Sequence, residues 1–463
     1  MATFPANNKV PGNAGLTTDL DTTYGLLQNI LGPVVLPSGD TTGATDAVNV
    51  QNAITTYGYA TIVAGLGPYY GKTTVTGNEG QFLNCIGIPT WNMKATGIAA
   101  FQWKQANAAT YSTTGTGGIR GRLIINGPGG ANNPSDGFIG VQMADIVQLE
   151  CDVAVFQCQW GILMSNQNFF TEQAQIRLFS QGNTNPLVLQ TAASGGASRT
   201  GSFDRGEFTV YHNDVTNASA GLGGVQLLAG ALVEGGWIKQ YGNFNGTGSA
   251  GKYALYVSGT APVGGFHSAI VGAQIIHAVE YDGTGTAIGT VFLDTGCYII
   301  HCEGTLDYVG MGAPSISATN AGFTFHGPIA GNTALLNALN LTVTTGFPAG
   351  VTGTVTFIPV GVGYGTSGGV SAWLMNFNLT VAATTTITSG STFFTLPALA
   401  VPTSGTYVGG IVYNALGSPS TDPIVLTVNS GGGAVCGFVS ATITTPGGGN
   451  SFIRGTAVYG AAF

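Results

Sequence analysis

Two pairs of acidic residues in this chain have a spacing that could support acid–base chemistry. Glu150 precedes Asp152 by two positions, and Glu280 precedes Asp282 in the same way. On a β-strand, residues i and i+2 share a face at roughly 7 Å, a separation compatible with the carboxyl pair of an inverting glycosidase. The alternative, which the sequence favours, is that both pairs hydrate the outer face of a β-structure.

A third group of acids lies close to aromatic residues in the sequence. Its members are Asp204, Glu207, Glu234, Trp237 and Tyr241. Sugars present apolar C–H faces that stack on Trp and Tyr, while their hydroxyl groups bond carboxylates. If positions 204 and 234 occupy neighbouring turns of a repeating β-structure, this group forms a candidate glycan-contact site. The alternative is a set of core aromatic residues with separate, solvated acids.

The histidines and glycines give no sign of metal or cofactor chemistry. The five histidines are His212, His267, His277, His301 and His326. None has the HxxxH or HExxH spacing of a metal site, and the glycine-rich segment 127–130 lacks the lysine of a phosphate-binding loop. We therefore predict no metal and no cofactor.

The cysteines are expected to be structural. They are Cys85, Cys151, Cys158, Cys297, Cys302 and Cys436, without a CxxC pair or the dense spacing of a disulfide scaffold. Cys151 shares the alternating apolar register of residues 147–155, so its sulfur is expected to face the core. We interpret all six as small buried hydrophobic residues.

Charged residues are scarce, and this scarcity constrains the fold. Only 7% of the residues are charged and 75 of 463 are Gly, whereas about a quarter of an ordinary chain is charged. From Tyr308 to Phe463 the single acid is Asp422 and the single base is Arg454. Because Thr, Ser and Asn can cover β-sheets and Gly supplies turns, we predict an all-β, turn-rich protein that assembles with partners.

The charge distribution also argues against some classes of partner. The net charge is −8, and no Lys or Arg occurs from Tyr253 through Ile453, which argues against binding nucleic-acid phosphates. No apolar run reaches the roughly 18 residues of a membrane helix, and the start lacks the apolar core of a secretory signal. We expect a protein without membrane insertion that is made and kept in a cytoplasm before use.

Helical periodicity is confined to the first 58 residues. A first short helix, which Pro33 ends, is predicted by Leu20, Tyr24, Leu27 and Leu31. A second is predicted by Ala47, Val50, Ile54 and Tyr57, with Thr45 or Asp46 as its N-cap and Gly58 at its end.

Short β runs separated by Gly and Asn occupy residues from about 80 to 330. Their variable spacing favours a parallel β-helix with long loops at some corners. A β-sandwich is the alternative, but Asn-Gly and Asp-Gly turns are too few to organise its hairpins.

Beyond about 332, Ile424–Val428 and Ala434–Thr444 flank a glycine turn and predict a hairpin. With almost no charge to protect its edge strands, this region is expected to oligomerise.

Three segments resemble parts of known proteins. Gly39–Ile54, with its Gly-Asp, its Thr-Asp and the predicted helix, resembles the capping segment of pectate-lyase-like β-helix proteins. Pro11–Asp21 is similar to the start of many phage minor tail proteins. Residues 387–402 with the terminal strand 455–459 resemble the C-terminal β-sandwich tips of phage tail spikes and fibres. Positions 399–401 lack the Gly and the basic residue that this last pattern places there.

The resemblance implies a homotrimeric phage tail spike or minor tail protein. Its fold class is all-β: a right-handed parallel β-helix shaft with short N-terminal helices and a C-terminal antiparallel β-sandwich. Three regions follow: a virion-attachment segment at 1–38, a pectate-lyase-like parallel β-helix at 39–330, and a trimerisation or receptor-binding β-sandwich at 331–463. The implied partners are two further copies, other phage tail or baseplate proteins through the N-terminus, and a host cell-surface glycan. The implied location is the virion, after assembly in the host cytoplasm.

The sequence favours a structural and binding role, in which the protein binds host envelope glycans during adsorption and no residue is assigned to catalysis. The alternative is a glycan depolymerase, a glycoside hydrolase or lyase that uses one of the two carboxylate pairs. A cellular surface adhesin is a third possibility, and it needs an export signal that the sequence does not show.

Overall fold

The structure is a computed structural model of the 463-residue chain. It describes residues 33–105, 115–128, 137–167, 170–191, 202–214, 223–245, 247–248, 251–261, 265–316, 323–331, 335, 341–359, 372–387, 392–395, 407–409, 424–428, 433–438, 443–444 and 451–460. The described residues form two compact units whose main boundary lies between Asn332 and Thr333.

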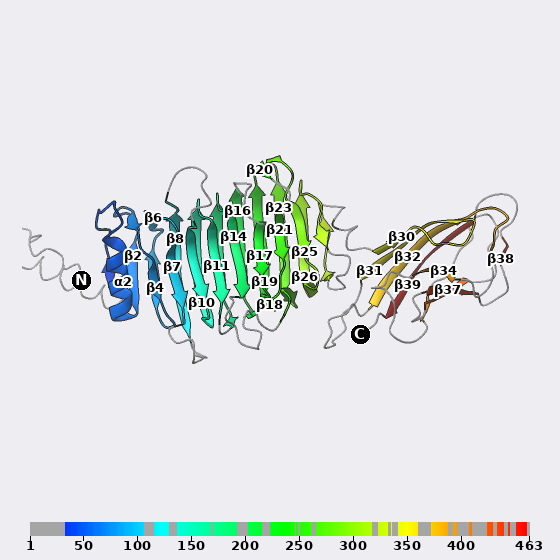
Figure 1. Ribbon diagram of the computed structural model, residues 1–463, viewed down its shortest axis with the longest axis horizontal. Helices are drawn as coiled ribbons and strands as arrows, with labels where there is room; N and C mark the ends of the chain where they lie inside the picture. Colours follow the sequence, from blue (N-terminus) through cyan, green and yellow to red (C-terminus); the bar gives the residue numbers. More distant parts are fainter. Residues whose placement is uncertain are drawn as a thin grey trace, which may run out of the picture. The chain divides into compact units, whose positions relative to one another are not determined.

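The first unit is a parallel β-helix in which successive turns of the chain add strands to two long sheets (Figure 1). The long strands of the first sheet are β1 (Val34–Val35), β2 (Tyr59–Val63), β5 (Phe82–Ile86), β8 (Thr116–Asn126), β10 (Gln148–Phe156), β13 (Gln175–Gln181), β16 (Glu207–Asp214), β19 (Trp237–Phe244), β23 (Gln274–Tyr281), β26 (Tyr298–Val309) and β29 (Ile329–Ala330). Shorter strands of this sheet in the first unit are β3 (Tyr69–Gly71), β6 (Thr90–Met93), β12 (Thr171–Glu172), β15 (Ser202–Asp204), β18 (Leu232–Glu234) and β22 (Ala269–Val271). Strand β28 (Phe323–His326) is assigned to the second unit.

The second sheet completes each turn of the β-helix. Its strands are β4 (Val75–Gly77), β7 (Ala99–Lys104), β9 (Ile139–Ala144), β11 (Trp160–Asn166), β14 (Asn185–Thr191), β17 (Gly223–Leu228), β21 (Tyr253–Val257), β25 (Gly289–Leu293) and β27 (Ser315–Ile316). A small parallel pair, β20 (Thr247–Gly248) and β24 (Thr284–Gly285), lies outside both long sheets. The described pairings in both long sheets are parallel, which confirms the predicted parallel β-helix and excludes the β-sandwich alternative for this unit.

Alternation along the strands fills the inside of the β-helix. Leu123, Val153, Leu178 and Val210 are register partners on four successive strands and are fully buried. Cys151 is also buried, as its register predicts. Successive residues on a strand point to opposite faces, so the residues between these positions face outward.

Helix α2 (Asp46–Tyr57) covers the first turn of the β-helix (Figure 1). It begins after Thr45 and ends at Gly58, whose left-handed backbone lets its N–H bond the Ile54 carbonyl, so the predicted helix is confirmed. The buried carboxylate of Asp46 accepts from the backbone N–H groups of Ser38 and Tyr70, at 2.7 and 2.9 Å. Asp46 therefore ties the helix to the chain on both sides of it. The helix predicted around residues 20–31 lies outside the described residues.

Four buried polar side chains on successive strands form a hydrogen-bonded chain inside the β-helix. The His212 Nε2 lies 2.9 Å from Gln240 Oε1, and Gln240 Nε2 donates to the Ala254 carbonyl at 3.0 Å. Gln240 Nε2 also lies 3.1 Å from His277 Nε2, and His277 Nδ1 lies 2.6 Å from the Tyr308 hydroxyl. The Ala254 carbonyl fixes the orientation of the Gln240 amide. Nε2 is then the protonated nitrogen of His212, and Nδ1 that of His277.

The second unit consists of antiparallel sheets. One contains β30 (Leu341–Val343), β31 (Val351–Pro359), β32 (Ala372–Val381) and β39 (Ser451–Gly460). Another contains β34 (Thr392–Thr395), β37 (Gly433–Phe438), β36 (Ile424–Val428) and β35 (Tyr407–Gly409), and β33 (Thr386–Ile387) pairs with β38 (Ile443–Thr444). The buried rings of Phe357 and Phe394 join the first two sheets at 6.1 Å, so they pack as a sandwich. The predicted hairpin corresponds to β36 and β37.

Within the described part of the chain, no helix is long and apolar enough to cross a membrane. Four of the described cysteines are buried and Cys85 is half-buried, in agreement with the predicted structural role.

Candidate functional site

An open groove of about 930 Å³ lies on the outer face of the first sheet. It crosses five adjacent strands, β8, β10, β13, β16 and β19. Since neighbouring strands lie about 4.8 Å apart, the groove extends roughly 19 Å along the β-helix. In-register parallel pairing places the outward-facing side chains of these strands in ladders that follow the groove.

Three such ladders line the groove. The first consists of Glu150, Gln175, Glu207 and Trp237. The second consists of Arg122, Asp152, Arg177, Thr209 and Lys239. The third consists of Phe179, Tyr211 and Tyr241. Charged groups therefore lie beside aromatic rings along the groove.

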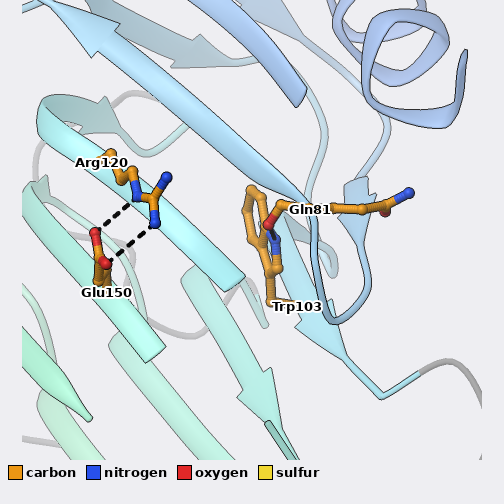
Figure 2. A network of polar contacts seen from close by, with 4 residues as sticks. All are labelled: Gln81, Trp103, Arg120 and Glu150. Atoms are coloured by element: carbon orange, nitrogen blue, oxygen red, sulfur yellow. Dashed lines mark hydrogen bonds and ion pairs between the residues drawn. The ribbon is translucent and has the colours of Figure 1, made fainter. Parts of the chain in front are cut away.

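A β-bulge in β8 forms one end of the groove. Ile119 pairs with Cys151 and Arg122 pairs with Asp152, so two residues of β8 are displaced from the register. A bulge re-aims side chains, and here Arg120 stacks its guanidinium 3.5 Å from the centroid of the Phe82 ring. Figure 2 shows that Arg120 also contacts both carboxylate oxygens of Glu150, at 3.0 and 3.4 Å.

The chain behind the bulge is anchored by a buried indole. Trp103 Nε1 donates to the Gln81 carbonyl at 2.9 Å (Figure 2). The Trp103 side chain is fully buried. This bond holds the residue before β5 against β7.

A second ion pair lies beside the first. Arg122 Nε is 3.5 Å from Asp152 Oδ1, and both side chains are partly exposed. The pair Glu150 and Asp152 does share the outer face, but each carboxylate is bound to an arginine of β8. Both carboxylates are therefore engaged in ion pairs within the protein, and this arrangement does not favour the acid–base role that the spacing allows.

The aromatic ladder presents rings at successive turns. Tyr211 and Tyr241 stack at 5.3 Å with an interplanar angle of 24°, and Tyr211 is 43% exposed. Phe179 precedes Tyr211 in the ladder, and its ring lies 5.9 Å from that of Phe156. The next position of this ladder, on β23, is the exposed Ala278, which pairs with Tyr241. Its small methyl group leaves that side of the Tyr241 ring open.

The Trp237 ring is less accessible to a ligand than its position among acidic and aromatic residues in the sequence suggests. The Lys239 ammonium lies 4.0 Å from the centroid of the Trp237 ring and covers one face of it. Its Nε1 is buried, with no hydrogen-bond partner among the described residues. Trp237 therefore holds Lys239 in the groove, and Tyr241 offers the more open ring.

The structure separates the five predicted glycan-contact residues into two sets. Glu207, Trp237 and Tyr241 line the groove. Asp204 and Glu234 are register partners on the short strands β15 and β18, where they continue a ladder that starts at Glu172, and they do not line the groove. The left-handed residue Arg205 turns the chain between Asp204 and β16.

The second carboxylate pair, Glu280 and Asp282, lies away from the groove. Both acids accept from the Asn243 amide nitrogen, at 3.2 and 2.8 Å. Asp282 follows the last residue of β23, so the two acids meet through Asn243 rather than through the alternation of one strand.

Sequence reasoning missed several groove residues, above all Arg120, Arg122, Arg177 and Tyr211. Their signal is the repetition of charged residues at alternate positions, as in Arg120 with Arg122 and Glu150 with Asp152. Aligning the β runs turn by turn would have placed these residues together. In the part of the chain that the structure describes, no three acidic, cysteine or histidine side chains are grouped to hold a metal ion.

No protein-family model matches the chain, and no curated protein matches it. Among solved structures, it is similar to the Dettilon tailspike protein at 12% identity and a TM-score of 0.24, with 92% of this chain and 95% of the other covered. It is also similar to the tailspike protein of E. coli bacteriophage HK620, at 11% identity and a TM-score of 0.21, covering 93% and 91%. A second structure of the HK620 protein, in complex with a pentasaccharide, has a TM-score of 0.19 at the same identity and coverage. At such low scores, these similarities support no conclusion about the groove.

Proposed function

We propose that this protein is a structural component of a phage tail, a tail spike or minor tail protein, that binds host envelope glycans during adsorption. The sequence resemblance at both ends of the chain supports this proposal, and so does the parallel β-helix followed by an antiparallel sandwich. The three regions keep the roles expected of them: residues 1–38 attach to the virion, 39–330 form the shaft, and 331–463 trimerise or bind the receptor.

The observation that carries the proposal is the groove. It places stacked tyrosines beside ladders of charged and amide side chains over five strands. Pyranose rings offer apolar faces to aromatic rings and hydroxyl groups to charged side chains, so this surface suits an extended saccharide. Glu207, Trp237 and Tyr241 remain the proposed contacts, whereas Asp204 and Glu234 are not among the residues that line the groove.

Removing the tyrosine rings is expected to weaken glycan binding. The purified protein is applied to an array of bacterial surface polysaccharides, and capture is compared for the wild type, Tyr241→Ala and Tyr211→Ala. Loss of a central aromatic contact weakens binding by about tenfold or more. Tyr256→Ala is the matched control, because Tyr256 stacks on Phe292 on the other sheet, at 4.3 Å. Equal capture by all four proteins contradicts the proposal.

The same preparations test the proposed assembly. Light scattering is expected to give three times the chain mass of 46.9 kDa, because the nearly uncharged C-terminal region needs partners for its edge strands. A monomeric mass would contradict the proposed trimer, but it would not change the conclusion drawn from the polysaccharide array.

A depolymerase is the second candidate, and the position of Glu207 favours it. This half-buried acid has no ion-pair or hydrogen-bond partner among the described side chains. It lies two strands from Glu150 in the same ladder, with Cα atoms roughly 10 Å apart. Inverting glycosidases use two carboxyl groups that lie roughly 6.5–9.5 Å from each other. Release of oligosaccharides from a captured glycan, abolished by Glu207→Gln, supports this candidate, whereas intact glycan after long incubation contradicts it.

A further inference from the structure

Basic side chains are concentrated in the groove to a degree that the composition does not suggest. The whole chain has 12 Lys and Arg residues and a net charge of −8. Four of these 12, Arg120, Arg122, Arg177 and Lys239, line the groove together with three acids. The groove is therefore locally balanced or slightly positive on a protein that is otherwise acidic.

Two of the four cations are already neutralised within the protein. Arg120 pairs with Glu150, and Arg122 pairs with Asp152. For Arg177 and Lys239, no acidic partner lies within 4.0 Å among the described residues. Their positive charges are therefore available to a ligand.

Arg177 and Lys239 stand on either side of a small residue. Both are register partners of Thr209, one strand to each side, so their Cα atoms are roughly 10 Å apart. The short Thr209 side chain leaves space between them and adds a hydroxyl donor. Lys239 is held in place by the Trp237 ring, and Tyr211 and Tyr241 follow two positions further along β16 and β19.

Two acids lie close to this arrangement: Asp152 is the register partner of Arg177 on its other side, and Glu207 is the second. Glu207 lies two positions before Thr209 on β16, on the same outer face. Arg177 and Lys239 flank Thr209, whose hydroxyl lies on the same face. The Asp152 carboxylate is already paired with Arg122, and Glu207 lies about 7 Å along the strand from Thr209. The planar guanidinium of Arg177 can bind both oxygens of a carboxylate or phosphate group, and Lys239 adds a second charge.

We propose that the glycan recognised in this groove is anionic, with a carboxylate or phosphate group of one sugar bound between Arg177 and Lys239 and the adjoining sugar ring on Tyr241. This inference rests on the proposed function and narrows it to a class of glycan. It also gives the two cations a specific role: they select charged repeats over neutral ones.

The test uses an array that holds three kinds of bacterial polysaccharide: uronate-containing, phosphate-containing and neutral. The wild type is expected to capture members of one anionic kind. Arg177→Gln and Lys239→Gln are each expected to weaken that capture by about tenfold, and chemical reduction of the carboxyl groups, or removal of the phosphates, abolishes it. Arg205→Gln is the matched control, since Arg205 is an exposed cation on the turn before β16 and does not line the groove.

The possible results distinguish a failure of the anionic-glycan inference from a failure of the proposed glycan-binding function. Capture of neutral glycans that Tyr241→Ala weakens and Arg177→Gln does not overturns the inference and keeps the proposed function. Anionic capture that is insensitive to both Arg177→Gln and Lys239→Gln also overturns it. If no glycan is captured, or if Tyr241→Ala changes nothing, the proposed function fails as well. Whether the anion is a carboxylate or a phosphate is decided by which chemical treatment abolishes capture.

Discussion

The β-helix is expected to lose stability as the pH falls from 6.5 toward 4, because two histidines are buried in it as neutral rings. Burial lowers the pKa of His212 from 6.5 to about 4. Burial, reinforced by the neighbouring His212, lowers the pKa of His277 from 6.5 to about 3. In the unfolded chain both rings bind protons near pH 6.5, whereas in the folded chain they resist protonation.

The direction of the pH effect follows from proton linkage. Between pH 6.5 and about 4 the unfolded state binds more protons than the folded state, so stability rises with pH in this window. The stability that depends on keeping the two rings neutral is fully present above pH 6.5. It is lost as the pH falls from 6.5 through the lowered pKa values of His212 and His277. Its size is on the order of 3 kcal/mol for each ring.

The hydrogen-bonded chain explains why the rings resist a proton. His277 Nε2 accepts from the Gln240 amide, so protonating it would set two donors against each other. His212 Nδ1 has no hydrogen-bond partner among the described residues. A charge there would be buried without compensation.

Denaturant midpoints between pH 8 and pH 4, followed by far-ultraviolet circular dichroism, measure this effect. The double variant His212→Asn, His277→Gln is expected to be less stable at high pH but to show a much flatter pH dependence. His267→Gln serves as control because it keeps both buried imidazoles. A wild type and double variant with parallel pH dependence would show that the buried rings do not cause the loss.

Replacing Gly121 by Ala is expected to destabilise the β-helix by about 3 kcal/mol and to disturb the groove. Gly121 has a φ of +78°, which L-residues adopt with strain, and a Cβ there would overlap the Cys85 carbonyl oxygen. Gly121 is one of the two extra residues of the bulge in β8, so relief of the overlap must move Arg120 and Arg122.

Thermal or denaturant unfolding and the polysaccharide array together test this prediction. Gly65→Ala is the matched control, because Gly65 also has a positive φ but has nothing within 4 Å of the position that an added methyl group would occupy. It should cost only the backbone strain of about 1 kcal/mol and leave glycan capture unchanged. Equal stability of the two variants would contradict the role assigned to the bulge.

Much of the fold could be predicted from local patterns. Helical spacing with Gly58 at its end predicts α2, and the alternation around Cys151 predicts which side chains fill the core. The glycine turn between two alternating runs predicts the hairpin of β36 and β37. Each of these patterns depends on residues that lie close together in the chain, so their periodicity alone indicates the local secondary structure.

The groove depends on information that local patterns do not contain. Turns of the β-helix differ in length, so the register that places Arg177 beside Thr209 and Tyr211 beside Tyr241 emerges from packing between turns. Asp204 and Glu207 are three residues apart, yet the turn at Arg205 puts them on different strands. Sequence proximity therefore grouped acids that the fold separates, and missed basic residues that it brings together.

The most direct test of the glycan-binding groove is a crystal or cryo-electron microscopy structure of the protein with a polysaccharide fragment captured from the array. We expect saccharide density along the outer face of β13, β16 and β19, with a sugar ring on Tyr241 and an anionic group between Arg177 and Lys239. Saccharide density on another surface, with this groove empty at a saturating concentration, would contradict the account.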